Sequence, residues 1–280
     1  MQPDDKFAKA AGLLLHSPPG EVDDVFNDIR GIVNDDAALQ EHIEPILAES
    51  NTQQFYIAEL KNSQSKVLLT PYNQVKTNEF IDPNTRTQFS FDHLHRTVIE
   101  EWEVQSDEAQ QDEELRKALQ QQVDGYVSKH YPSGCATVFL HEAAVVTCIV
   151  SNRFSPSNFW NGSWRSVWSF DASSGQLNGS VKVKVHYFED GNVQLDTQTD
   201  FSADISKQDG ETEEKVAERV AKVIKEYEAQ FQQSIADGYR QLSERTFKGL
   251  RRMLPLTRSK VDWEKLANYK IGGELANAES

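Results

Sequence analysis

The stretch VKVKVHYFEDGNVQL, residues 181–195, decides the fold. In its first half, Val and Tyr residues alternate with Lys182, Lys184 and His186, which is the period-two pattern of a strand with one apolar face. An Asp-Gly pair follows and readily adopts the positive φ values of a type I′ turn, after which the alternation resumes. The stretch predicts an antiparallel hairpin, with His186 at a solvated or interface position on the lysine face.

Three more strands precede this hairpin at hairpin spacing. Apolar runs cover Thr137–His141 and Val145–Val150, and alternate residues of 164–170 are Trp, Ser, Trp and Phe. We interpret the Asn-Gly pair at 161–162 as a turn that leads into a strand with packed tryptophans, in preference to an aromatic platform for sugars. Together the five strands predict an antiparallel meander over residues 136–205.

A long amphipathic helix is predicted after the sheet, over residues 206–254. Apolar residues recur at three- and four-residue steps from Val216 to Leu242. At about 1.5 Å per residue such a helix spans roughly 60 Å. Five strands at a spacing of about 4.8 Å make a sheet only about 24 Å wide. A second chain that extends the sheet would resolve the mismatch, so the pattern favours an obligate dimer.

The first half of the chain contains two smaller regions. Residues 1–55 predict three short helices in a small bundle, although Pro45 weakens the third. Residues 56–135 hold short strand-like pieces, an acidic run over 100–114 and a helix that ends at Pro132. We interpret the acidic run as a solvated loop or helix start. The fold class predicted for the whole chain is α+β.

The composition excludes several classes of protein. The chain of 280 residues has a formal net charge of −15 and a pI near 4.9, which opposes general nucleic-acid binding. No run of about 18 apolar residues predicts a membrane span, and the N-terminus lacks the pattern of a secretory signal. Cys135 and Cys148 lie in or beside apolar runs and are interpreted as buried free thiols of a cytoplasmic protein.

The sequence contains no recognisable constellation for catalysis, for a metal or for a cofactor. His141-Glu142 lacks the second histidine of a zincin helix and lies in a strand pattern. His93 and His95 share one face of a possible strand, but no third ligand is nearby, so a surface or structural pair is favoured. We therefore expect no enzymatic activity, no cofactor and no metal.

Positive charge gathers near the C-terminus in FKGLRRMLPLTR, residues 247–258. Between residues 240 and 270, nine basic residues stand against three acids, which is typical of an interaction tail. A short helix predicted from Asp262 places Trp263 and Leu266 on one side. So short a helix is marginal alone in water, so this face is expected to dock on the body of the protein or on a partner. Residues 255–280 are interpreted as the tail.

Several segments together resemble a known family. FWNGSWRS (159–166), VHYFEDGNVQL (185–195) and FKGLRRMLPLTR (247–258) resemble the α subunit of the actin-filament barbed-end capping protein, called CapZ in muscle. DWEKLANYKIG, residues 262–272, also resembles the tail of that family. The chain departs from the family pattern at Ser163, where a basic residue is expected.

The resemblance implies a binding protein of the cytoplasm and the actin cytoskeleton. It implies an obligate heterodimer with a capping protein β subunit, in which the two chains share one ten-stranded antiparallel sheet. N-terminal helices form a stalk, a long helix from each subunit crosses the sheet, and each chain ends in a mobile tail. The tails bind the barbed end of an actin filament independently of calcium and block subunit addition and loss. Phosphoinositides and capping-protein regulators are further partners that the resemblance implies.

Two sets of site residues follow from the resemblance and from the residue patterns. Actin-binding residues are expected at Lys248, Arg251, Arg252, Arg258, Lys260, Trp263 and Leu266. Heterodimer contacts are expected at Tyr187, Val193, Tyr227, Phe231, Ile235 and Tyr239. Cations near the C-terminal end of a helix interact favourably with the helix dipole. This is a competing explanation for one or two of Lys248, Arg251 and Arg252. It does not extend to Arg258, which follows Pro255.

An alternative interpretation is a peripheral protein that binds acidic phospholipids. Each basic residue near an anionic membrane contributes about 1 kcal/mol of attraction, and the basic run supplies several of them. This role is compatible with actin binding as a secondary function. An enzyme on an α+β scaffold is the third interpretation, and it lacks a site.

Overall fold

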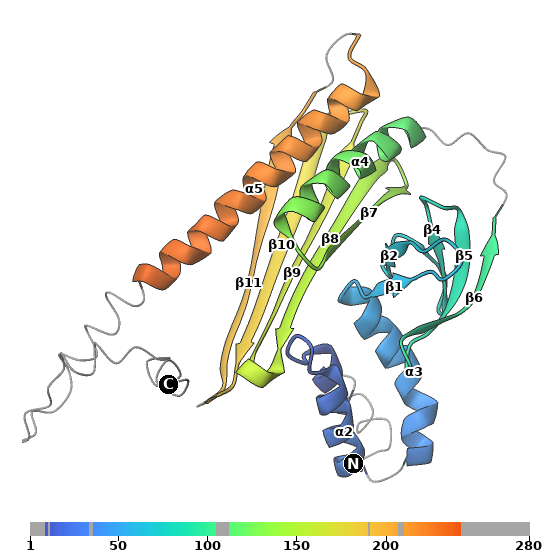
Figure 1. Cartoon of the computed structure of the whole chain (residues 1–280), viewed down its shortest axis with the longest axis vertical. Coiled ribbons are helices and arrows are strands. Elements are labelled where there is room, and N and C mark those ends of the chain that lie inside the picture. The colour runs from blue at the N-terminus through green and yellow to red at the C-terminus, as the bar shows by residue number, and fades with distance from the viewer. Residues whose placement is uncertain are drawn as a thin grey trace, which may run out of the picture. The chain divides into compact units, whose positions relative to one another are not determined.

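The computed structural model describes residues 9–10, 12–33, 36–104, 112–189, 191–206 and 210–241, with the backbone alone over 36–42 (Figure 1). The chain divides into two compact units, Met1–Phe231 and Gln232–Ser280, and the boundary falls inside the last helix. Within the described residues, no helix is both long enough and apolar enough to cross a membrane.

Helical segments begin the first unit, as the apolar spacing predicts. Residues 12–15 are helical, and after a turn the chain forms α2 (Val22–Val33) and α3 (Asp36–Gln53). Leu14, Ile29 and Leu47 are buried together in a small core. α3 continues through Pro45, which is exposed, so solvent can satisfy the carbonyl group that loses its hydrogen bond there.

Two small antiparallel sheets follow the helices. β1 (Ile57–Glu59) pairs with β2 (Lys66–Leu68). A four-stranded sheet contains, in order, β3 (Gln74–Lys76), β4 (Glu79–Asp82), β5 (Thr87–Asp92) and β6 (Thr97–Glu103). Phe80, Phe89 and Phe91 fill the core of this region.

The structure corrects the prediction of a loop or helix start for the beginning of the acidic run. Glu100, Glu101 and Glu103 belong to strand β6, which pairs with β5. The Glu101 carboxylate accepts the backbone N–H groups of Lys61 and Asn62 at 2.7 and 3.1 Å. Long-range pairing and these hydrogen bonds outweigh the local repulsion between the acids. The middle of the run, residues 105–111, lies outside the described residues.

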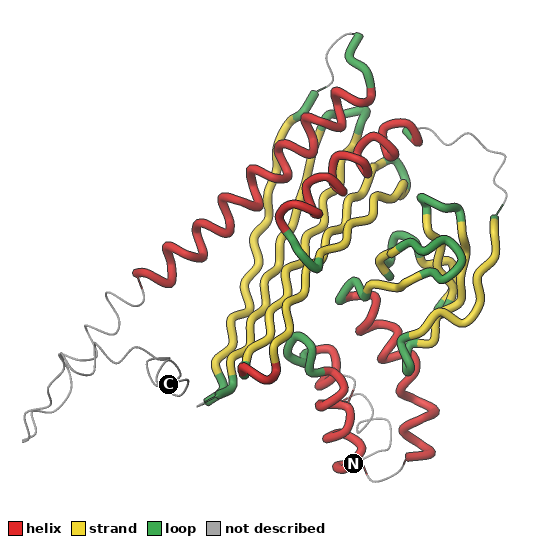
Figure 2. The backbone as a smooth tube through the Cα atoms, viewed as in Figure 1, coloured by secondary structure: helices red, strands yellow, loops and turns green. Residues whose placement is uncertain are grey.

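The five strands predicted at hairpin spacing form one antiparallel meander in the order β11-β10-β9-β8-β7 (Figure 2). They are β7 (Gly134–His141), β8 (Ala144–Ser155), β9 (Trp160–Asp171), β10 (Gln176–Tyr187) and β11 (Val193–Asp204). β8 and β9 extend beyond the predicted apolar runs, because polar residues such as Asn152 and Ser163 continue the pairing.

The Asn-Gly pair at 161–162 lies inside β9, so the predicted turn there is wrong. The turn comes earlier, in a 3-10 segment at Pro156–Asn158 followed by Phe159 with a φ of 57°. Asn161 is buried, where its Oδ1 accepts the Ser155 N–H at 3.1 Å and its Nδ2 donates to Glu21 at 3.0 Å. These bonds fix Asn161 in extended backbone and outweigh the turn preference of an Asn-Gly pair.

Two helices cover one face of the large sheet: α4 (Glu113–His130) and, through Phe231, α5 (Glu213–Gln241) (Figure 1). The helix predicted to end before Pro132 is thereby confirmed. Leu119, Val123, Val220 and Ile224 pack from the helices against the sheet. Burying each such side chain stabilises the fold by about 1.5–3 kcal/mol. The part of the long helix predicted after residue 241 lies outside the described residues.

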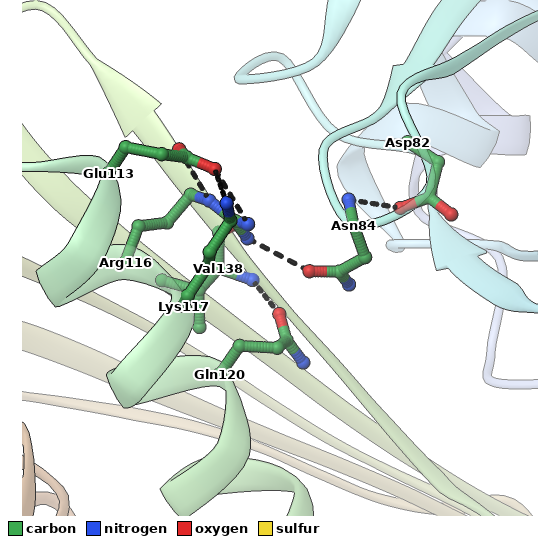
Figure 3. A network of polar contacts seen from close by, with 7 residues as sticks. All are labelled: Asp82, Asn84, Glu113, Arg116, Lys117, Gln120 and Val138. Carbon is green, nitrogen blue, oxygen red and sulfur yellow. Dashed lines mark hydrogen bonds and ion pairs between the residues drawn. The ribbon is translucent and has the colours of Figure 1, made fainter. Parts of the chain in front are cut away.

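A buried arginine ties α4 to the rest of the unit (Figure 3). Arg116 is 2% exposed and donates to Glu113 at 2.9 Å, to Asn84 Oδ1 at 2.8 Å and to the Val138 carbonyl at 3.3 Å. Burial alone would raise the pKa of Glu113, but the hydrogen bonds and charge of Arg116 outweigh it and hold that pKa below its ordinary value. Arg116 thus joins α4, β7 and the turn after β4.

The opposite face of the sheet holds the two cysteines. Cys135 and Cys148 are buried free thiols, as predicted, and they pack with Phe55 and Leu68. Burial raises the pKa of the Cys135 thiol to about 12 and that of Cys148 further above its ordinary value. Neither thiol is therefore ionised near neutral pH.

His186 also faces this side, and the predicted solvated or interface position is wrong. Its side chain is buried, and its Nδ1 lies 2.6 Å from Glu21 Oε1 and its Nε2 lies 3.2 Å from Asn192 Oδ1. The segment before α2 covers this end of the lysine face. No local pattern in β10 indicates that cover, because Glu21 is distant in sequence.

Candidate functional site

The large sheet ends in an open edge at β11. β11 pairs with β10 in an unbroken register, from Gln176–Asp204 to Tyr187–Val193, and no described residue pairs with its other side. In an antiparallel strand, alternate residues direct their backbone groups to each neighbour. About half of the N–H and C=O groups of β11 therefore face outward, which makes this strand a template for a strand of another chain.

The opposite edge, β7, is closed by side chains of α4. Gln120 accepts the Val138 N–H at 2.7 Å and donates to the Ala136 carbonyl at 3.2 Å. Arg116 donates to the Val138 carbonyl at 3.3 Å, and Figure 3 shows Arg116 and Gln120 reaching this strand from the helix. β2 also contacts β7, through a hydrogen bond of 3.3 Å from the Leu68 N–H to Thr137 Oγ1. The same chain thus satisfies one edge and leaves the other open.

β11 carries three exposed aspartates but lacks the other devices that protect an edge strand. Its sequence, VQLDTQTDFSAD, contains no lysine and no proline, and its pairing with β10 contains no bulge. A strand of twelve residues is also long for an unprotected edge. These properties favour pairing with a further strand in the assembled protein.

Two of the residues predicted at the dimer interface lie at one end of this edge. Tyr187 and Val193 are opposite each other in the β10–β11 ladder. Tyr187 is 36% exposed and Val193 is 63% exposed. The structure thus leaves them accessible to a partner.

Tyr227 and Phe231 of α5 pack on the sheet of their own chain and stay half-exposed. The Tyr227 ring lies 4.8 Å from that of Phe201, centroid to centroid, and its hydroxyl donates to the Ser202 carbonyl at 3.3 Å. The Phe231 ring lies 5.8 Å from that of Trp164. Both residues hold α5 on the sheet and leave part of each ring accessible.

Ile235 and Tyr239 continue the same helix in the second unit. They follow Tyr227 and Phe231 at steps of four residues, so the four share one side of α5. Ile235 is half-exposed and Tyr239 is 51% exposed. This stripe is the apolar surface that α5 offers beyond Phe231.

A buried carboxylate that sequence reasoning missed anchors α5. Glu228 is fully buried and accepts hydrogen bonds from Tyr126 and Tyr131 at 2.8 Å each, from Ser166 at 2.5 Å and from Trp168 Nε1 at 3.3 Å. The sequence held one signal: Glu228 continues the four-residue series of Val216, Val220 and Ile224, so it lies on the buried side of the helix.

The two tyrosines show the electrostatic effect of this arrangement. Burial raises the pKa of Tyr131 well above its ordinary value, and the negative charge of Glu228 raises it further. The same two causes raise the pKa of Tyr126. Both hydroxyls therefore stay protonated and remain donors to Glu228.

The histidines predicted as a surface or structural pair occupy different surroundings. His93 is buried, with its Nδ1 3.3 Å from Asn51 Nδ2 and its Nε2 3.3 Å from the Thr77 carbonyl. His95 is exposed and lies 2.7 Å from an Asp92 oxygen. Among the described residues, no group of three potential metal ligands occurs.

The predicted actin-binding residues all lie outside the described residues. These residues are Lys248, Arg251, Arg252, Arg258, Lys260, Trp263 and Leu266.

Comparison with known proteins covers the tail as well as the body. The family model for the F-actin capping protein alpha subunit matches residues 10–274. This chain belongs to that family. The match spans the open edge, the long helix and most of the basic tail, so the resemblance seen in the sequence is confirmed.

Curated members of the family are similar along nearly their whole length. F-actin-capping protein subunit alpha of Caenorhabditis elegans is 35% identical, and the alignment covers 97% of each chain. The corresponding subunit of Neurospora crassa is 33% identical over 94% of each chain. That of Dictyostelium discoideum is 32% identical over 95% of this chain and 96% of the relative.

A solved structure shares the fold of this family member. It is the homodimeric actin capping protein alpha subunit from Plasmodium berghei, with a TM-score of 0.73 and 23% sequence identity. The superposition covers 92% of this chain and all of that one. The α+β class, with antiparallel sheets and a C-terminal helix, is thereby confirmed.

Proposed function

We propose that this chain is the α subunit of a heterodimeric F-actin capping protein, which binds the barbed ends of filaments. Binding blocks subunit addition and loss and needs no calcium. The observation that carries this proposal is the family match through residue 274, which includes the basic tail. The role is one of binding at the actin cytoskeleton in the cytoplasm, with no catalytic step.

The open β11 edge supports a shared sheet. A capping protein β subunit that pairs with β11 would extend the five strands to ten and satisfy the outward backbone groups. Tyr187 and Val193 would lie at that junction, and the stripe from Tyr227 to Tyr239 would meet the partner. The same extension would support the long helix predicted over residues 206–254, whose predicted length exceeds the width of five strands.

Charge supports the tail, residues 255–280 with the basic positions just before them, as the actin-binding element. Actin is acidic, so a basic patch on a body of net negative charge accelerates and orients the encounter. Exposed ion pairs contribute only about 0.2–1 kcal/mol each. Tight capping therefore requires several of the basic residues together with burial of Trp263 and Leu266.

Co-expression with a β subunit tests the assembly. We expect the chain to aggregate alone and to form a soluble one-to-one complex, measured by sedimentation equilibrium. A stable complex of two copies of this chain, unchanged by the β subunit, would contradict the heterodimer.

Elongation of labelled actin from filament seeds tests the activity. The complex should stop barbed-end growth at substoichiometric amounts, equally with calcium and with a chelator. The triple variant Lys248→Ala, Arg252→Ala and Arg258→Ala should cap at least about tenfold more weakly. A matched loss of three charges on the body, in Lys61→Ala, Lys129→Ala and Lys222→Ala together, should leave capping unchanged. Unimpaired capping by the tail variant would refute the site.

Acidic phospholipids are the second candidate ligand, supported by the same basic run. We propose them as a secondary role, in which phosphoinositides compete with actin for the tail. Sedimentation with phosphoinositide vesicles in the absence of actin measures it. Loss of pelleting in the tail variant is expected, and no pelleting by the wild-type complex would exclude the role.

A further inference from the structure

A cavity of about 430 Å³ lies between the N-terminal helical segments and the sheet face opposite α4 and α5. Residues near the ends of the first helical segment and of α3 form one side, and side chains of β8, β9 and β10 form the other. The volume is within the usual range of small-molecule sites. The cavity is remote in sequence from the basic tail, and every residue that lines it belongs to the first unit.

The walls of this cavity carry positive charge. Arg96, Arg165, Lys182 and Lys184 line it, and no aspartate or glutamate does so among the described residues. Such a grouping is unexpected in a chain with a net charge of −15. Since a cavity with low-dielectric walls of one sign concentrates the field, this one attracts anions.

The strand register brings three of the cations together. Arg165 of β9 is directly opposite Lys182 of β10, and Lys184 follows two residues later on the same face. Like charges directly opposite each other destabilise a sheet. The arrangement therefore carries a cost that a bound anion would remove.

One carboxylate compensates these charges in part. Asp196 of β11 lies 3.6 Å from Lys182 Nζ and 3.7 Å from Lys184 Nζ, and its side chain is 55% exposed. Burial lowers the pKa of Lys184 below its ordinary value, and the neighbouring cations lower it further, although Asp196 opposes both effects. The lysines thus share one acid at distances longer than a hydrogen bond.

Arg165 is the most available of the four cations. Its guanidinium lies over the Phe55 ring at 5.5 Å, and within the described part of the chain it makes no hydrogen bond or ion pair. Burial lowers its pKa, and Asp196 opposes that shift. Arg96, in contrast, is paired with Asp23 at 2.9 Å. A planar guanidinium held by an aromatic ring is suited to bidentate contact with phosphate oxygens.

We propose that this cavity, through Arg165, Lys182 and Lys184, binds a multiply charged phosphate compound. Three cations against one shared acid match a ligand of at least two negative charges. The ligand contacts the sheet on one side and the N-terminal segment on the other, so its binding stabilises their packing. The site is independent of actin binding by the tail.

Calorimetric titration of the complex with sodium tripolyphosphate at fixed ionic strength tests the site. Lys182→Gln and Lys184→Gln should each weaken binding about tenfold, since each removes a charge-assisted contact. Lys61→Gln removes the same charge from an exposed turn and should change the dissociation constant less than about twofold. Equal affinity in all these proteins, or no binding to the wild type, would overturn the proposal.

Asp196→Asn provides the opposite test and does not depend on destabilised variants. It releases both lysines from their shared carboxylate, so tripolyphosphate should bind about threefold to tenfold more tightly. Unchanged or weaker binding in this variant would overturn the assignment of the two lysines. Because Asp196 is exposed, its replacement should leave the fold intact, and a thermal melt that matches the wild type is the control measured first.

Vesicles of phosphatidylinositol 4,5-bisphosphate form a second arm that identifies the source of the phosphate. Pelleting that the two lysine changes abolish assigns a lipid headgroup to the cavity. Tripolyphosphate binding without such pelleting assigns a soluble ligand, and either result supports the site. Pelleting that depends only on the tail, together with no tripolyphosphate binding, overturns it.

Discussion

Removal of the Glu228 carboxylate should release α5 from the sheet. Its two oxygens accept four hydrogen bonds from two elements: from Tyr126 and Tyr131 at the end of α4, and from Ser166 and Trp168 on β9. In Glu228→Ala the hydroxyl groups find other partners only in part, and the Trp168 N–H loses its acceptor. A buried polar group without a partner costs about 1–3 kcal/mol.

The expected loss in Glu228→Ala is about 5 kcal/mol, since several buried donors lose their acceptor and a cavity is left. For a chain of this size that loss lowers the melting temperature by about 10 °C. Glu228→Gln keeps the shape and exchanges charged hydrogen bonds for neutral ones, so about 2 kcal/mol is expected. Glu226→Gln is the control, because that side chain is 58% exposed and the ion pair that it makes within the described residues, to Lys222, is 4.0 Å long.

Thermal melting of the complex at fixed concentration measures these effects. A second readout is the pH dependence at alkaline pH. Tyr126 and Tyr131 have a raised pKa in the folded state, so their contribution to stability is complete below about pH 10 and is lost as the pH rises above it. This loss should be shallower in Glu228→Gln, because one cause of the raised pKa is gone. A melting temperature of Glu228→Ala within about 2 °C of the Glu226→Gln control would refute the reasoning.

Three further predictions concern the body of the protein. Gly179→Ala should cost about 1–3 kcal/mol in unfolding free energy, because the new Cβ would lie 2.1 Å from the Trp168 ring, and a null effect would show that the ring can move. Arg116→Leu should cost about 3 kcal/mol by chemical denaturation, because it breaks a buried ion pair, and a loss below about 1 kcal/mol would contradict that role. Cys135 and Cys148 should react with a thiol reagent at pH 8 only after unfolding, and labelling of the native protein at the rate of the denatured one would refute their burial.

The large sheet was predictable from the sequence because its signal is local. Alternation along residues 181–195 requires only that one face be buried, and the pairing of β10 with β11 follows from the turn between them. Long-range contacts produce the features that the local sequence patterns did not predict. Glu100 joins a strand because β5 pairs with it, and His186 is buried because Glu21 reaches it from a distant segment.

The candidate site likewise has one part that local sequence patterns indicate and one part that depends on long-range contacts. Exposure at Tyr187 and Val193 follows from their place at the end of the hairpin, which the sequence indicates. The cavity proposed to bind phosphate was not predictable, because Arg165 and Lys182 become neighbours only through the register of two strands. Lysines that alternate along a strand indicate a solvated face until the N-terminal segment is known to cover it.

The difference between the two edges of the large sheet supports the proposal that a partner chain pairs with the open edge, β11. At β7 the chain places Arg116 and Gln120 where they satisfy outward backbone groups, although burying an arginine is costly. Over β11 the described side chains reach backbone carbonyls only near one end, where Tyr227 donates to Ser202 and Gln176 donates to Ala203, and the strand has no proline and no lysine. Since the chain satisfies backbone groups of β7 with its own side chains, it could satisfy those of β11 in the same way. The asymmetry therefore supports the proposal that a second chain completes the sheet, and it is independent of the argument from the predicted length of the helix.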